Sequence, residues 1–77
     1  ATEISFLLPA PTPTQLTVYN LQGQQVRVLH NGFLEKGVHR MRWDGTDAQG
    51  NNLATGVYFA QLRAGSRSQA RKMLLLR

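Results

Sequence analysis

The stretch "WDGTDAQGNNLATGVYF" at residues 43–59 decides how this chain folds, because it joins the middle of the sequence to its last third. It holds two aspartates, two asparagines and three glycines. These residue types occur in metal-binding loops, in sugar-binding loops and in structured turns between strands. The choice among the three determines whether the stretch is a binding site or a scaffold.

A calcium loop of the EF-hand type does not fit the spacing of this stretch. Such a loop requires a glycine at its sixth position and a glutamate at its twelfth. Counted from Asp44, the sixth residue is Gln49 and the twelfth is Thr55. Calcium held by Asp44, Asp47 and Asn51 in another kind of loop stays an alternative.

A structured crossover between two strands fits the stretch better. The side chains of Asp44 and Asp47 can accept hydrogen bonds from backbone amides a few residues ahead. Gly45 and Gly50 can adopt backbone angles that other residues avoid. We therefore predict a scaffold role for the stretch, with ligand binding as a secondary possibility, and we expect no metal site and no cofactor.

On both sides of this stretch, apolar and polar residues alternate with the period of a β-strand. The segment that ends at Trp43 sets His39, Met41 and Trp43 on one face. The pattern predicts strands near residues 2–8, 14–20, 25–31, 38–43, 52–54, 56–64 and 66–77. About seven short strands without a helix are typical of an antiparallel β-sandwich.

Local signals refine the second and third of these strands. Asn20 lies three residues before Gly23, which predicts a type I turn that joins the two strands into a hairpin. Val26 and Val28 share one face, but Leu29 breaks the alternation and predicts a bulge.

Two further expectations concern the ends of the core. Tyr58 follows the turn at Gly56, where a sandwich places a tyrosine whose hydroxyl bonds to an upstream backbone group. Residues 31–37 should form a loop in which Phe33 or Leu34 covers one end of the core.

The length of 77 residues predicts a single domain over residues 1–77. The sequence has neither an initiating methionine nor a leader, so we expect a fragment of a larger protein. No apolar run approaches the roughly 18 residues of a transmembrane helix, so no transmembrane segment is expected. The absence of cysteine rules out disulfides and thiol catalysis.

The net charge is +5, and five of the nine basic residues fall within residues 63–77. Such a stripe suits either an anionic partner or a solvated sheet face. It contains no aromatic residue on which bases could stack, so we do not expect a nucleic-acid partner.

Catalytic signals are weak. His30 and His39 fall on different predicted strands, and the sequence has no nucleophile elbow of the G-x-S-x-G type. Asp44 and Asp47 would need a deep cleft to act as a glycosidase pair, which so small a sandwich can hardly provide. We therefore expect no catalytic residues and no enzyme activity.

Taken together, three motifs resemble one known family. They are "WDGTDAQG" at residues 43–50, "TGVYF" at residues 55–59 and "RKMLLLR" at residues 71–77. The chain resembles, over nearly its whole length, the Ig-like C-terminal domain shared by the flagellar hook-capping protein and by type IX secretion C-terminal sorting domains.

The resemblance implies an Ig-like sandwich that serves as a C-terminal sorting and cell-surface attachment domain of an exported, hydrolytic multidomain protein. Its implied partners are the secretion apparatus, cell-surface components and the upstream domains of the parent protein, and its implied location is secreted or at the cell surface. The sorting residues implied by the family are Lys72, Met73, Leu74, Leu75, Leu76 and Arg77. The structural motif comprises Trp43, Asp44, Gly45, Asp47, Gly50, Gly56 and Tyr58.

Two other functions remain open at this point. One is an Ig-like assembly module of the flagellar hook-cap type, which packs against other proteins on a growing filament. The other is an accessory carbohydrate-binding module, which would need exposed aromatic residues as stacking platforms.

Overall fold

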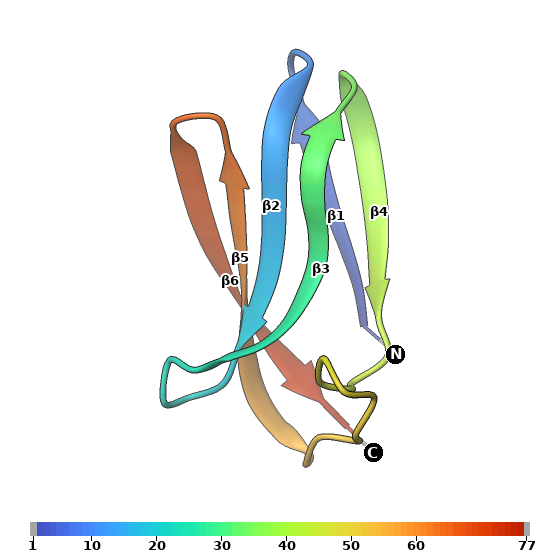
Figure 1. The fold of residues 1–77 in the computed structure, drawn as a ribbon, viewed down its shortest axis with the longest axis vertical. Coiled ribbons are helices and arrows are strands. Elements are labelled where there is room, and N and C mark those ends of the chain that lie inside the picture. Colours follow the sequence, from blue (N-terminus) through green and yellow to red (C-terminus); the bar gives the residue numbers. More distant parts are fainter. Residues whose placement is uncertain (1, 77) are drawn as a thin grey trace.

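A computed structural model describes residues 2–76, which form two antiparallel sheets (Figure 1). The strands are β1 (Thr2–Leu8), β2 (Thr12–Tyr19), β3 (Gln25–Leu34), β4 (Gly37–Trp43), β5 (Gly56–Ala64) and β6 (Arg67–Leu75). β1 pairs with β4 in a two-stranded sheet, and the other sheet has the order β3-β2-β5-β6. The prediction of an all-β fold with two antiparallel sheets is therefore confirmed.

The described residues contain six strands, so the predicted count of about seven is not confirmed. The difference lies at residues 52–54, where only an isolated bridge joins Asn52 to Thr46. The backbone amide of Leu53 donates to Gly45 O at 2.9 Å, and the amide of Asp47 donates to Asn51 O at 3.0 Å. Because these groups bond within the loop, they cannot form a ladder with a neighbouring strand.

The core lies between the two sheets and follows the predicted alternation. The apolar side chains buried there are Ile4, Leu16, Val18, Trp43, Tyr58, Ala60, Met73 and Leu75. The side chain of Trp43 is the largest of those that are almost fully buried. Burying one large apolar side chain stabilises a fold by about 1.5–3 kcal/mol, so these few residues carry much of the stability.

The hairpin between β2 and β3 forms as predicted. Gly23 has a φ of 80° and donates its amide to Asn20 O at 3.0 Å. The side-chain oxygen of Asn20 also accepts from the amide of Gln24 at 2.9 Å. In the ladder, Leu16 faces His30 and Thr17 faces Val28, so Leu29 is the extra residue of a bulge and the prediction of a bulge is confirmed.

The expected loop at residues 31–37 is shorter than predicted. β3 continues to Leu34, which pairs with Thr12, and only residues 35 and 36 separate it from β4. Phe33 is 60% exposed and does not cover the core, while Leu34 is half-buried. Asn31 and Gly32 are of residue types that are common in turns, which is why a loop was predicted. Pairing with the start of β2 keeps this segment extended instead.

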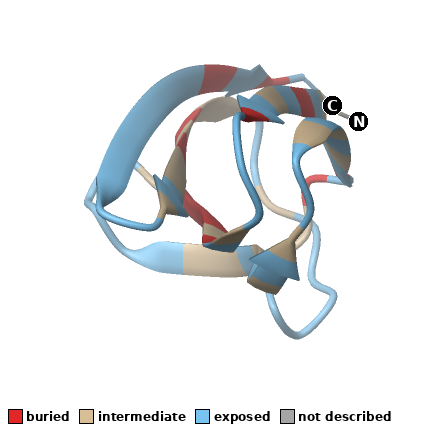
Figure 2. Ribbon diagram, turned by 90° about the horizontal axis from the view of Figure 1, so that it is seen from above, coloured by how far each residue is buried: buried red, intermediate tan, exposed pale blue. Residues whose placement is uncertain are grey.

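The two sheets differ in width, and this leaves part of the larger sheet uncovered. β6 pairs only with β5, and β1 pairs only with β4, so each has one free edge within the described residues. In β6, residues 67–72 are exposed, and only Met73 and Leu75 are buried. Figure 2 shows β6 pale blue along most of its length and red only near the C-terminal end.

No helix within residues 2–76 could cross a membrane.

Candidate interaction surface

The loop between β4 and β5 is held by its own two aspartates. The carboxylate of Asp44 accepts from the amide and the hydroxyl of Thr46, at 3.1 and 2.6 Å. The carboxylate of Asp47 accepts from the amides of Gln49 and Asn51, both at 2.9 Å. These contacts are the turns expected from the sequence, and in each aspartate one carboxylate oxygen accepts both bonds.

The same contacts lower the pKa values of both aspartates. The side-chain hydrogen bond from Thr46 is the largest cause of the lowered pKa of Asp44, followed among the lowering contacts by the amide of Thr46 and the charge of Arg27. The backbone hydrogen bond from Asn51 is the largest cause of the lowered pKa of Asp47. Donors to a carboxylate favour its charged form, so both side chains stay ionised at neutral pH.

Arg27 of β3 ties this loop to the larger sheet. Its guanidinium donates to Thr46 Oγ1 at 2.7 Å and to Asp47 O at 3.1 Å. The amide of Ala48 donates to Val26 O at 3.1 Å beside it. This role of Arg27 could not be predicted from the sequence, because no local pattern marks a residue whose partners lie about twenty positions away.

Trp43 and Tyr58 form the packed centre beneath the loop. Trp43 is 1% exposed, and its indole N–H donates to Thr46 O at 3.0 Å. The two rings meet edge to face, with centroids 5.2 Å apart. The hydroxyl of Tyr58 donates to Ala54 O at 2.7 Å, which is the upstream backbone bond expected from the sequence. A buried Trp43 cannot serve as a stacking platform for a sugar.

The glycines of the motif do not share one role. Gly45 and Gly50 have φ angles of 79° and 85°, where a side chain would be strained. Gly56 begins β5 and has no such angle in the structure. Within residues 2–76, no group of three acidic or histidine side chains could hold a metal ion. The calcium alternative at Asp44, Asp47 and Asn51 stays a prediction, because Asn51 is neither acidic nor a histidine.

The basic and apolar segment at the C-terminal end divides between core and surface. Met73 and Leu75 are buried in the core, at 6% and 3% exposure. Leu74 and Leu76 are 58% and 72% exposed, and Lys72 is exposed as well. Arg77 lies outside the described residues. The six predicted sorting residues therefore do not form one continuous surface.

Comparison with known proteins identifies the family. The model of the FlgD Ig-like domain matches residues 1–68 of the chain. The chain belongs to the FlgD Ig-like domain family. The family is that of a structural, non-enzymatic assembly domain, in agreement with the expectation that this chain is not an enzyme.

A solved structure of FlgD from P. aeruginosa resembles this fold closely. The TM-score is 0.68 at 26% sequence identity, and the match covers 95% of this chain. This chain spans 58% of the length of that FlgD chain. No curated protein sequence matches the chain.

These matches contradict the prediction of a type IX secretion sorting and cell-surface attachment domain. Both matches are to FlgD, the flagellar hook-capping protein. The prediction rested on three motifs taken together, and the family match includes the motifs at residues 43–50 and 55–59 but not the implied sorting residues 72–77. Met73 and Leu75 alternate with polar or exposed neighbours because they fill the core, so this pattern reflects strand packing rather than a signal.

Proposed function

We propose that this chain is a non-catalytic Ig-like assembly module of the flagellar hook-cap type. The observation that carries the proposal is the match to the FlgD Ig-like domain over residues 1–68. The loop geometry supports it, since the carboxylates of Asp44 and Asp47 accept hydrogen bonds that hold the loop. The module would act by packing against other protein subunits.

Free strand edges and exposed apolar side chains supply a surface for such packing. The outer edge of β6 offers unpaired backbone groups, which can add a strand from another protein. Leu74 and Leu76 lie at the end of that strand and are both largely exposed. An apolar centre beside a hydrogen-bonding edge is a common design of protein interfaces.

The parent protein is proposed to be larger than this chain, with residues 1–77 as one of its domains. The same proposal implies that the parent protein assembles outside the cell. It also implies that this domain contacts the other domains of the parent protein. FlgD from P. aeruginosa supports the first point, because this chain spans only 58% of that chain.

A chimaera tests the assembly role. The segment of P. aeruginosa FlgD that matches this chain is replaced by residues 1–77, and hook assembly is scored by electron microscopy and by motility. Assembled hooks are expected, because the fold matches over 95% of the chain. A chimaera that is exported and folded but leaves hooks unassembled would contradict the role.

Paired surface variants locate the contacts within the chimaera. Leu74→Lys with Leu76→Lys should reduce assembly, because charges replace the apolar end of β6. Val38→Lys is the control, since Val38 is 65% exposed but lies in the other sheet. Equal effects of the two changes would argue against the β6 surface.

A further inference from the structure

The uncovered part of the larger sheet forms a groove between β1 and the inner face of β6. Its volume is about 710 Å³, and Leu8, Leu62, Ala64, Arg67 and Gln69 contribute to its lining. A second hollow of about 200 Å³ shares Leu62 and Gln69 with it and extends toward Arg71. The two hollows adjoin at Leu62 and Gln69, and together they form the groove between β1 and β6, each of which has a free edge.

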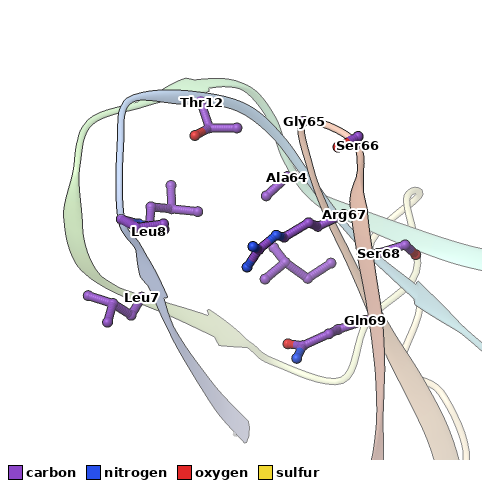
Figure 3. Close-up of a pocket in the computed structure, with 11 residues that line it drawn as sticks. Leu7, Leu8, Thr12, Ala64, Gly65, Ser66, Arg67, Ser68 and Gln69 are labelled. Atoms are coloured by element: carbon purple, nitrogen blue, oxygen red, sulfur yellow. The ribbon is translucent and has the colours of Figure 1, made fainter.

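The inner face of β6 is charged in its N-terminal part, although its C-terminal part on the same face is buried in the core. Met73 and Leu75 point into the core, so Arg67, Gln69 and Arg71 share their face by strand alternation. Figure 3 shows the side chains of Arg67 and Gln69 directed into the groove, whereas Ser68 points away from it. The inner face of this edge strand is thus apolar at one end and basic at the other.

The residues that pair with Arg67 and Arg71 on β5 have small side chains, which leaves space on the inner face of the sheet. Arg67 pairs with Ala64 and Arg71 pairs with Ala60, while Gln69 pairs with Leu62 between them. Within residues 2–76 neither guanidinium has a hydrogen-bond or ion-pair partner. A guanidinium with free donors is suited to bind carboxylates.

We propose that this groove receives an extended acidic segment of a partner protein. The segment would add a third strand to the two-stranded sheet at the free edge of β1. Its inward side chains would alternate acidic, apolar and acidic, so that two carboxylates meet Arg67 and Arg71 and the apolar residue covers Leu62. This inference rests on the assembly role proposed above, because it names the chemistry of the partner.

Spacing and charge both favour this occupant. Arg67 and Arg71 are four residues apart on a strand, a separation of about 13 Å, and an extended partner repeats with the same period. The chain carries nine basic and four acidic residues, which favours an acidic partner over a second copy of itself. The free edge of β1 adds backbone hydrogen bonds that do not depend on the partner's side chains.

A peptide titration tests the groove directly. The probe is a blocked nine-residue peptide with serine at outward positions and Glu, Val and Glu at the central inward ones. Binding is measured by calorimetry and by amide NMR shifts of the chain. We expect shifts in β1 and β6, and a dissociation constant at least about tenfold weaker when both glutamates are replaced by glutamine.

Matched arginine variants separate the groove from general charge attraction. Arg67→Ala with Arg71→Ala should weaken binding at least about tenfold. Arg40→Ala with Arg42→Ala removes the same charge from the exposed outer face of β4 and should leave binding nearly unchanged. Equal weakening by the two pairs, or no binding at millimolar peptide, would overturn the proposal. Equal weakening would mean that the peptide is held by general charge attraction and not by the two arginines of the groove.

The chimaera distinguishes this inference from the assembly role. If the chimaera assembles hooks and Arg67→Ala with Arg71→Ala does not impair it, the groove is not the partner site and the assembly role stands. If the peptide binds in the groove but the chimaera does not assemble hooks, the groove stands and the assembly role fails.

Discussion

Single residues of the loop and its base show how a domain without disulfides holds a long crossover in place. Tyr58 reaches back to Ala54 O, Trp43 donates to Thr46 O, and Arg27 bonds to the loop from β3. Each contact joins the loop to a residue that the core already fixes. The loop therefore gains its order from the sandwich beneath it as well as from its own turns.

Tyr58→Phe removes one hydrogen bond and keeps the ring. We expect the free energy of unfolding to fall by about 1 kcal/mol, since the carbonyl of Ala54 loses its donor. Urea unfolding followed by Trp43 fluorescence measures the change. An unchanged midpoint would show that the bond contributes nothing to stability.

Trp43→Ala removes the largest side chain of the core. The free energy of unfolding should fall by about 3–5 kcal/mol, because Trp43 is almost fully buried, and this is a large share of the stability of so small a domain. Circular dichroism during heating measures the loss. A variant that melts at the wild-type temperature would mean that neighbouring side chains fill the cavity without loss of stability.

Acid should weaken the loop through its aspartates. The pKa values of Asp44 and Asp47 are lower in the folded chain than the ordinary 3.8. Their stabilisation is therefore complete above that value and is lost as the pH falls through the lower folded values. Melting temperature should drop in this acid range. Asp44→Asn with Asp47→Asn should show a smaller drop, and an equal drop would exclude these residues as the cause.

At the scale of elements, β6 combines two functions along one strand. Its C-terminal half closes the core through Met73 and Leu75, and its N-terminal half is exposed on both faces. An edge strand with inward-pointing charges resists pairing with strands of other molecules. A protein with such a free edge can therefore stay soluble. Edge protection and selective capture of an acidic strand can thus come from the same arginines.

Adjacent leucines at the end of β6 provide a matched test. Leu75→Ala should cost about 2–5 kcal/mol, because Leu75 is 3% exposed. Leu74→Ala should change stability by no more than about 0.5 kcal/mol, because Leu74 is 58% exposed. Chemical denaturation of both variants gives the comparison. Similar losses would contradict the assigned inner and outer faces of β6.

At the scale of the whole molecule, a net charge of +5 spreads over a small sandwich with a Cα radius of gyration of 12.4 Å. Like charges at such separations repel one another and oppose the compact state. A basic surface also raises the encounter rate with an acidic partner at low salt. The net positive charge therefore favours binding of an acidic partner and lowers the stability of the folded state.

Added salt should stabilise the chain. Raising sodium chloride from about 10 mM to about 200 mM screens the repulsion and should raise the melting temperature by roughly 2–5 °C. Calorimetry at two salt concentrations measures the shift. A fall in melting temperature would indicate that favourable ion pairs outweigh the repulsion.

Much of the fold could be predicted from local patterns. Alternation around Trp43 and Tyr58 indicated which faces are buried, and Asn20 with Gly23 indicated a hairpin turn. The strand count and the extent of β3 could not be predicted this way, because both depend on which backbone groups find partners in other segments. The same reason hid the role of Arg27, whose partners lie far along the chain.

The strand period, the inner face of each strand and the turns at glycine and aspartate are encoded locally, because they follow from contacts between near neighbours. The pairing of four strands opposite two, and the position of Arg67 and Arg71 beside an open groove, arise only when distant segments meet. Sheet width and free edges depend on pairing between distant segments, and no short stretch of sequence encodes that pairing.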